Sequence, residues 1–264
     1  MSRFSRKKYI ICSICAILTA LVLGGCSSGR KTLSIGFDSE FPPYTYVDEN
    51  GDFAGFDIEL ARAVCEIEGW ELQLHAIAWD EKDVLLNSGE IDCIWSGFTI
   101  NGREESYTLT QPYCENTCVV VVKSDSSITS LEDLASKAVG TQAASSCAEY
   151  LANDERGKAL AKEFMLLSQF TTYDDAFESL EKGNLEVILI DAGIEKYYVE
   201  KAEGKFRILQ EPLIEEKYGV ALKKGNTKLC DILNKDLQKL SEDGTMMELA
   251  KKYQIEESVV IQSK

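Results

Sequence analysis

The sequence predicts an α/β fold of two lobes, each containing a mostly parallel sheet flanked by helices. Short apolar segments with strand character alternate with segments of helical periodicity along the chain. One unit also occurs twice, because the pattern of residues 86–92 returns at residues 180–186, each time before a buried strand. We expect the first lobe to comprise residues 32–117 and 217–264, and the second lobe residues 118–216.

The first half of the chain begins with a predicted strand over Thr32–Phe37, followed by a loop with two prolines. Residues 48–51 predict a hairpin turn. Asp57 is the expected N-cap of a helix with an apolar face. A strand at 70–77, a helix at 80–87 that ends at Gly89, and a buried strand at 91–94 follow. The chain then turns polar at Ser96 and Gly97.

The second half continues the alternation. A valine run at 118–122 is long enough to pass from one lobe to the other. Residues 130–133 form a capping box that predicts a short helix. Further strands are predicted at 139–142, 187–190, 206–209 and 219–222, and further helices at 147–153, 174–182, 193–201, 229–240 and 246–253.

The first twenty-five residues have the pattern of a signal peptide. Four basic residues precede an apolar stretch from Tyr9 to Leu23, which is short for a membrane span. Small residues then lead to Cys26, as in the lipobox of a bacterial lipoprotein. We expect cleavage before Cys26, lipidation of this cysteine, and a tether over residues 26–31. A plain secretory signal with an incidental cysteine is the alternative. Several acyl chains on Cys26 would anchor the protein to the outer side of the cell membrane.

Composition excludes some kinds of partner. The chain has 28 basic and 44 acidic residues, and loss of four basic residues with the signal leaves 24 against 44, a net charge of −20. This balance excludes nucleic acid as a partner. There is no CxxC pair and one histidine, His75, so we expect neither a metal site nor a cofactor.

The cysteines of the exported chain leave their pairing open. Cys114 and Cys118 could form a disulfide only if the backbone between them turns. Cys65 and Cys93 lie on apolar faces, and we expect them to be buried free thiols.

Polar groups cluster where predicted strands end, and these ends are the candidate binding site. In parallel sheets, ligands bind beyond the carboxyl ends of the strands. Arg103 follows one strand closely and offers a planar fork for a carboxylate, although a surface ion pair is the simpler interpretation of a single arginine. Ser145 and Ser146 precede a helix and could bind an anion, cap the helix, or do both. Asp191 ends another buried strand.

In this order the motifs resemble the family 3 extracellular solute-binding proteins, the receptors of ABC importers for amino acids. The resemblance covers nearly all of the chain after the signal. The matching segments are residues 38–44, 55–61, 79–80, 88–92, 96–100 with Arg103, 111–113, 139–142, Asp191 and 243–245.

The resemblance implies a type II periplasmic-binding-protein fold, with two hinged lobes that close on a free amino acid. Asp38 and Gln142 suit a polar or cationic side chain, so we expect a polar amino acid. It implies that Arg103 binds the α-carboxylate, helped by Ser96, Gly97, Thr99, Ser145 and Ser146. It implies that Asp191 binds the α-ammonium group. Phe41 and Trp79 would enclose the ligand side chain, with Asp38 near its tip. The simpler interpretation of both aromatic residues is a place in the core, although the prolines beside Phe41 suggest an exposed loop.

This chain departs from the family pattern at two places that bear on the site. Ala144 stands where the family usually has glycine, and alanine tolerates a positive φ poorly. Residues 81–84, which include Lys82, stand where the family has apolar residues and a proline, so we expect this helix to present a more charged face.

The expected partners are a free amino acid, the transmembrane subunits of an ABC importer, and the membrane through the lipid anchor. Two alternatives use the same fold: an enzyme similar to cyclohexadienyl dehydratases, and the ligand-binding module of a sensory receptor. The sequence favours neither, because it lacks a Ser–His or Cys–His pair and has no later apolar span before Lys264.

Overall fold

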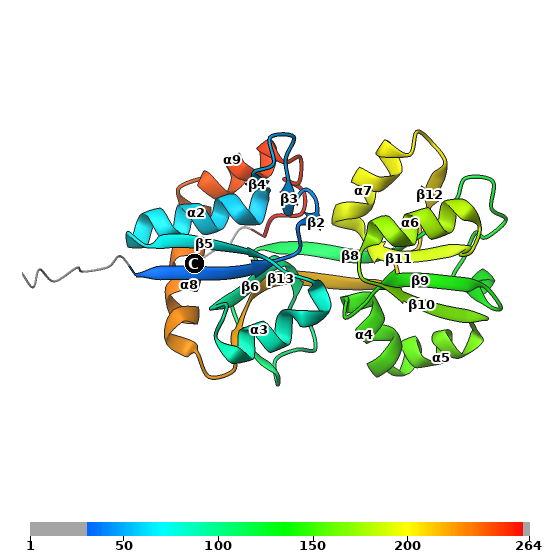
Figure 1. Cartoon of the computed structure of the whole chain (residues 1–264), viewed down its shortest axis with the longest axis horizontal. Coiled ribbons are helices and arrows are strands. Elements are labelled where there is room, and N and C mark those ends of the chain that lie inside the picture. The colour runs from blue at the N-terminus through cyan, green and yellow to red at the C-terminus, as the bar shows by residue number, and fades with distance from the viewer. Residues whose placement is uncertain (1–30, 261–264) are drawn as a thin grey trace, which may run out of the picture. The chain divides into compact units, whose positions relative to one another are not determined.

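A computed structural model describes residues 31–260 of the chain (Figure 1). The predicted signal peptide, Cys26 and nearly all of the tether lie outside the described residues. Among the described residues, no helix combines the length and the apolar character needed to cross a membrane.

Strands make up the centre of the fold and helices cover it. The strands are β1 Thr32–Phe37, β2 Glu40–Phe41, β3 Thr45–Val47, β4 Phe53–Ala54, β5 Glu71–Ala76, β6 Cys93–Thr99, β7 Tyr107–Leu109, β8 Cys114–Lys123, β9 Ala138–Gln142, β10 Leu166–Phe170, β11 Val187–Asp191, β12 Phe206–Ile208 and β13 Ile214–Lys223. The helices are α2 Phe56–Glu68, α3 Lys82–Ser88, α4 Ser146–Asn153, α5 Glu155–Glu163, α6 Tyr173–Lys182, α7 Ala192–Lys201, α8 Thr227–Glu242 and α9 Thr245–Lys252, with single 3₁₀ turns at Trp79–Glu81 and Glu132–Leu134.

The main sheet is parallel at its two ends and antiparallel in its middle. Its strand order is β10-β9-β11-β8-β13-β6-β1-β5, with β12 paired to β8 and β7 paired to β13. β1 pairs in parallel with β5 and β6, and β9 pairs in parallel with β10 and β11. β8 and β13 are antiparallel to each other and to their outer neighbours. The α/β class with a sheet flanked by helices is confirmed.

The two long central strands contain both predicted lobe boundaries. The boundary before residue 118 falls in β8, and the boundary before residue 217 falls in β13. In Figure 1, α2, α3, α8 and α9 surround the β5-β1-β6 end of the sheet, and α4 to α7 surround the β10-β9-β11 end. The division into lobes stays a prediction; below, "first part" means residues 32–117 and 217–260, and "second part" means residues 118–216.

Most predicted elements are present, and the differences have physical reasons. β6 runs on to Thr99, so the prediction that the chain leaves the strand at Ser96 was wrong; Gly97 is buried within it in a left-handed conformation. Gly55, not Asp57, is the N-cap of α2, and Asp57 lies in its first turn. α5 and β10 were missed, because α5 contains a glycine and β10 has its side chains half exposed or exposed.

The disulfide in the structure is not the Cys114–Cys118 pair that the sequence left open. Cys114 and Cys118 both lie in the straight strand β8, where residues four apart are roughly 13 Å from each other. Cys118 forms a disulfide with Cys147 in the first turn of α4. Cys65 and Cys93 are buried free thiols, as predicted.

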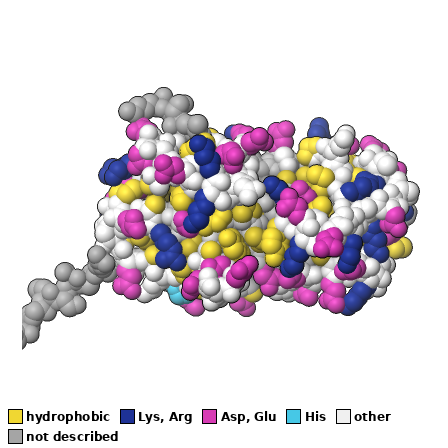
Figure 2. Space-filling model, turned by 90° about the horizontal axis from the view of Figure 1, so that it is seen from above, with side chains coloured by type: hydrophobic (Ala, Val, Ile, Leu, Met, Phe, Trp, Pro, Cys, Tyr) yellow, Lys and Arg dark blue, Asp and Glu magenta, His cyan; other side chains and the backbone are white. Residues whose placement is uncertain are grey.

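Charged side chains of both signs are mixed on the face seen in Figure 2, where acidic and basic groups lie among apolar ones. Below this surface, the core is built from the apolar faces of the sheet and the helices, including Phe37, Trp95, Val120 and Leu189. The polar groups buried at the strand ends therefore stand out from their surroundings.

Candidate functional site

A small cavity of about 10 Å³, roughly the space of one water molecule, lies where the strands β6, β9 and β11 end. Its lining combines two aromatic rings, a guanidinium group, a carboxyl group, an amide and hydroxyl groups. The lining residues are Phe41, Trp79, Gly97, Thr99, Arg103, Gln142, Ser145, Ser146 and Asp191. Arg103 comes from the first part of the chain and Asp191 from the second, so one cavity brings a guanidinium group and a carboxyl group together.

Arg103 is buried, and one nitrogen of its fork has no hydrogen-bond partner. Nε donates to Glu149 Oε2 at 2.8 Å, and Nη1 donates to the carbonyl oxygen of Thr99 at 3.1 Å. The guanidinium carbon lies 4.4 Å from the centre of the Phe98 ring. Nη2 is the buried donor that these contacts leave unpaired, and an unpaired buried donor costs about 1–3 kcal/mol.

Asp191, the last residue of β11, is held by two donors from the central strands. Its Oδ1 accepts hydrogen bonds from Asn116 Nδ2 at 2.8 Å and from the Tyr218 hydroxyl at 2.7 Å. Burial, and next the nearby Glu216 carboxylate, raise the pKa of Asp191 well above its ordinary value. A cation in the cavity would therefore stabilise the ionised form of this carboxyl group.

Asp38 lies directly behind the cavity lining, where it contacts the second part of the chain. Gln142 Nε2 donates to Asp38 Oδ2 at 2.6 Å, and the backbone N–H of Glu40 donates to Oδ1 at 2.8 Å. Burial raises the pKa of Asp38, while both hydrogen bonds oppose this shift. Gln142 thus links the cavity to a buried acidic group at its edge.

Both predicted aromatic residues line the cavity and are also packed. Phe41 is 6% exposed and Trp79 is 7% exposed, so the expectation of an exposed loop at Phe41 was wrong. The reason is that Phe41 pairs with β3 as part of β2 and packs against Tyr44. Phe41 and Trp79 are therefore both buried in the core and part of the cavity lining.

Gly97 and Ser96 form hydrogen bonds that hold the backbone around the site. The sequence alone did not predict these bonds. The Gly97 N–H donates to Asp57 Oδ2 at 2.7 Å, so this donor is already engaged. A side chain at Gly97 would meet the Phe41 ring at 2.5 Å, which explains the glycine there. Ser96 does not line the cavity; its hydroxyl accepts from the Asp38 N–H and bonds the Thr45 hydroxyl.

The loop from Gln142 to Ser146 brings two hydroxyl groups to the cavity. Ser145 is the N-cap of α4, and its hydroxyl accepts from the Ala148 N–H at 3.2 Å. Ala144 has φ = 54°, the left-handed conformation that the resemblance assigns to glycine. Alanine adopts it here despite a cost of about 1 kcal/mol or more.

Two buried residues near the site were missed by sequence reasoning. Lys82 is 1% exposed, and Asn116 is also buried. The sequence places Lys82 among Glu81 and Asp83, which predicts a solvated helix face, and Asn116 within a strand. No signal identified Asn116, but the departure from the family pattern at Lys82 did mark that position.

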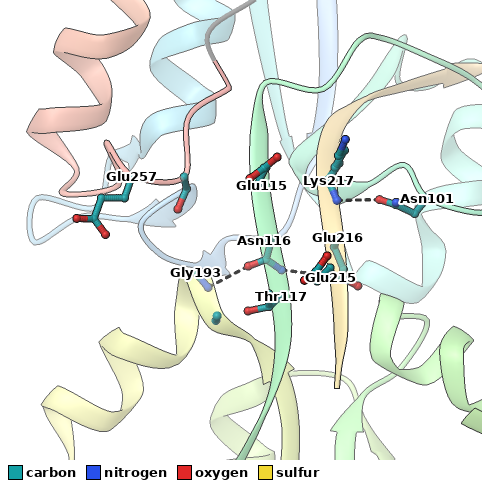
Figure 3. A pocket seen from close by; sticks show the side chains of 11 residues that line it. Asn101, Glu115, Asn116, Thr117, Gly193, Glu215, Glu216, Lys217 and Glu257 are labelled. Carbon is teal, nitrogen blue, oxygen red and sulfur yellow. Dashed lines mark hydrogen bonds between the residues drawn. The ribbon is translucent and has the colours of Figure 1, made fainter. Parts of the chain in front are cut away.

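A larger cavity of about 520 Å³ adjoins the site behind Asn116, where Gly193 and Glu216 also line it (Figure 3). Asn116 donates to Glu216 Oε2 at 2.8 Å and accepts from the Gly193 N–H at 3.2 Å. The smaller cavity is the better candidate site, because its lining contains both the arginine and the aspartate.

Comparisons with known proteins agree on one family. The family model described as bacterial extracellular solute-binding proteins, family 3, matches residues 33–256. The L-cystine-binding protein TcyJ of Escherichia coli K12 is 27% identical over 85% of this chain and 83% of its own length. The arginine-binding extracellular protein ArtP of Bacillus subtilis is 27% identical over 94% of this chain and 98% of its own length.

Solved structures give the same result. An ABC uptake transporter substrate-binding protein from Streptococcus pneumoniae with bound histidine has a TM-score of 0.78 and 32% identity, over 84% of this chain and 92% of that one. An ancestral arginine-binding protein bound to arginine has a TM-score of 0.77 and 33% identity, over 85% and 98%.

Proposed function

Because this chain belongs to the family 3 bacterial extracellular solute-binding proteins, we propose that it binds a free amino acid in the small cavity and delivers it to an ABC importer. The observation that carries this proposal is the pairing of Arg103 and Asp191 around one cavity. A free amino acid carries one negative and one positive group close together. Two buried groups of opposite sign replace the water that both ends of such a ligand lose.

The carboxylate end of the ligand is assigned to Arg103. Its Nη2 is buried and has no partner, so a carboxylate oxygen there would satisfy it. Thr99, Ser145 and Ser146 line the same cavity and offer further polar groups. A hydrogen bond between charged groups contributes roughly 1.5–3 kcal/mol.

The ammonium end is assigned to Asp191. Asn116 and Tyr218 hold its Oδ1, which fixes the orientation of the carboxyl group at the cavity. A few charge-assisted hydrogen bonds, less the cost of association, give micromolar affinity at about −8 kcal/mol. The affinity then depends on both ends of the ligand being bound at once.

The ligand side chain is assigned to the space between Phe41 and Trp79, with its tip toward Asp38 and Gln142. The buried Asp38 carboxyl group favours a polar or cationic side chain over an apolar one. The ligands named for the arginine-bound and histidine-bound relatives belong to this class. We therefore propose a polar amino acid, with a cationic side chain as the first candidate.

Binding requires that the two parts of the chain separate and close. A cavity of about 10 Å³ is smaller than any amino acid, and links such as the one between Asp38 and Gln142 join the two parts across it. We propose a clamp that opens these links, admits the ligand and closes again, with β8 and β13 as the connecting strands.

We further propose that the protein acts outside the cytoplasm on a lipid anchor. The basic and apolar leader and the small residues before Cys26 support this proposal. Replacement of Cys26 by serine should move the protein from the membrane fraction to the soluble fraction of the cells. Equal membrane retention of both proteins would contradict the anchor.

A thermal-shift screen of the purified protein tests the amino-acid proposal. The probes are the twenty amino acids with ornithine and cystine, and the matched variant is Arg103→Ala. One class of amino acid should raise the melting temperature of the native protein by several degrees and leave that of the variant unchanged. The bound compound should also be recovered chemically unchanged, whereas conversion would indicate the enzyme alternative. No shift with any of these compounds would contradict the proposal.

A further inference from the structure

We propose that Lys82 is a positioning residue that fastens the loop of Ser145 and Ser146 over the bound ligand. This inference rests on the proposed function, because it concerns the same cavity. Lys82 is the first residue of α3 and is 1% exposed. Its ammonium group donates to the carbonyl oxygen of Ala144 at 3.0 Å, from the first part of the chain to the second.

The two residues that depart from the family pattern are therefore in direct contact. Lys82 replaces an expected apolar residue, and Ala144 replaces an expected glycine. Ala144 has φ = 54°, which costs an alanine more than it costs a glycine. A charge-assisted hydrogen bond to its carbonyl group offsets part of this cost. The lysine therefore helps to hold the conformation that presents the next two residues to the cavity.

Lys82 also contacts Trp79, a residue of the cavity lining. Its ammonium group lies 5.2 Å from the centre of the Trp79 ring, which lines the cavity. Burial lowers the pKa of Lys82, and Arg103 lowers it further, while the carboxylates of Asp80, Asp83 and Glu149 oppose this shift. A buried cation next to Arg103 adds positive potential where the ligand carboxylate is assigned.

Three hydrogen bonds join residues 142–149 to the first part of the chain. Gln142 bonds Asp38, Glu149 bonds Arg103, and Ala144 bonds Lys82. The first two engage side chains that we assign to the ligand.

The bond from Lys82 to Ala144 differs from the other two, because it uses a lysine and a backbone carbonyl that the ligand does not need. This bond can therefore form in full while the ligand occupies both ends of the site. We therefore assign it to the ligand-bound, closed state.

The test compares Lys82→Met with the native protein, using the amino acid that the screen identifies. Methionine has a similar length and no charge or strong donor. The matched control is Lys228→Met, which removes an exposed lysine on α8. We expect Lys82→Met to raise Kd about tenfold through faster dissociation, with an unchanged association rate and ligand-free melting temperature. Lys228→Met should change none of these. A Kd for Lys82→Met within twofold of the native value would overturn the proposal.

The double variant Lys82→Met with Ala144→Gly tests the role of the loop. Glycine adopts a positive φ at little cost, so it should recover part of the affinity lost in Lys82→Met. A merely structural role of Lys82 in α3 predicts no recovery, and that result would count against the proposal.

Amine labelling of the native protein gives a test that needs no variant. With saturating ligand, Lys82 should react with an acylating reagent far more slowly than Lys228, as mass spectrometry of the peptides would show. Equal labelling rates in the complex would overturn the proposal. If the native protein binds no amino acid, the proposed function itself fails; if it binds one and Lys82 changes nothing, only this inference fails.

Discussion

Asp57 is a buried acid that supports the site without facing its cavity. Its Oδ2 accepts from the Gly97 N–H at 2.7 Å and from the Tyr113 hydroxyl at 2.8 Å. Burial raises the pKa of Asp57 to about 7, although both hydrogen bonds oppose the shift. This carboxyl group thus binds the backbone of Gly97, which lies beside Phe41 in the cavity lining.

This raised pKa predicts that stability falls as the pH rises. The ordinary pKa of the carboxyl group is 3.8, so between about pH 4 and pH 7 the folded state binds more protons than the unfolded state. The stabilisation is complete below this window and is lost as the pH rises through it. Asp57→Asn keeps an acceptor for Gly97 without the charge, so the variant should lack this dependence.

Denaturant unfolding of the native protein and Asp57→Asn at several pH values measures the effect. The difference in free energy of unfolding, native minus variant, should decline by at most about 4 kcal/mol from pH 4 to pH 7. The control Asp231→Asn, an exposed aspartate on α8, should give a difference that does not vary. A flat curve for Asp57→Asn as well would show that the prediction is wrong.

The site residues that could be predicted from the sequence are those at or just after the end of a buried strand. Arg103 and Asp191 were predicted together because polar groups after buried strands gather at one edge of a sheet, and both do line one cavity. Lys82 and Asn116 were missed because their burial depends on what packs over them. A lysine between two acidic residues is expected to be exposed to solvent. Here a loop that is distant in the sequence covers Lys82.

At the scale of elements, the disulfide ties the central strand β8 to the helix that bears the hydroxyl groups. Cys118 and Cys147 are 29 residues apart in the sequence, with their Cα atoms 6.3 Å apart. The sequence could not choose this pairing, because it depends on where α4 docks. Strand and helix periodicity predicted β8 and α4 themselves, whereas α5 and β10 lack a clear apolar face.

Removal of this disulfide should lower stability while the site remains. A crosslink across about 30 residues contributes roughly 2–4 kcal/mol, mainly by restricting the unfolded chain. Cys118→Ala with Cys147→Ala should therefore melt several degrees lower than the native protein. Cys230→Ala, which removes a free thiol, is the control for the loss of a cysteine.

Reducing conditions provide the comparison that decides this prediction. Unfolding in the presence of a thiol reductant should lower the melting temperature of the native protein to that of the double variant, and should leave the double variant unchanged. Equal melting temperatures of the native protein and the double variant without reductant would contradict the stabilising role.

At the scale of the whole molecule, the ligand would add a further link between the first and second parts of the chain, which the long strands β8 and β13 connect. Arg103 follows β6 in the first part and Asp191 ends β11 in the second. The order of the strands could be anticipated only in outline, since the sequence does not specify that β8 and β13 pair in the middle of one sheet. In the proposed clamp, β8 and β13 are the strands about which closure would occur.

Calorimetry with a matched pair of ligands tests the central claim most directly. The pair consists of the amino acid identified by the screen and its deaminated analogue, which has the same side chain and carboxylate without the ammonium group. Loss of the charge in Asp191→Asn should weaken binding of the amino acid by about a hundredfold, because its ammonium group loses a charged, buried partner. We expect the analogue to bind weakly to the native protein, and its affinity should change by less than about threefold in the variant. If Asp191→Asn weakened both ligands by the same factor, Asp191 would not be the partner of the ammonium group and the account would be wrong.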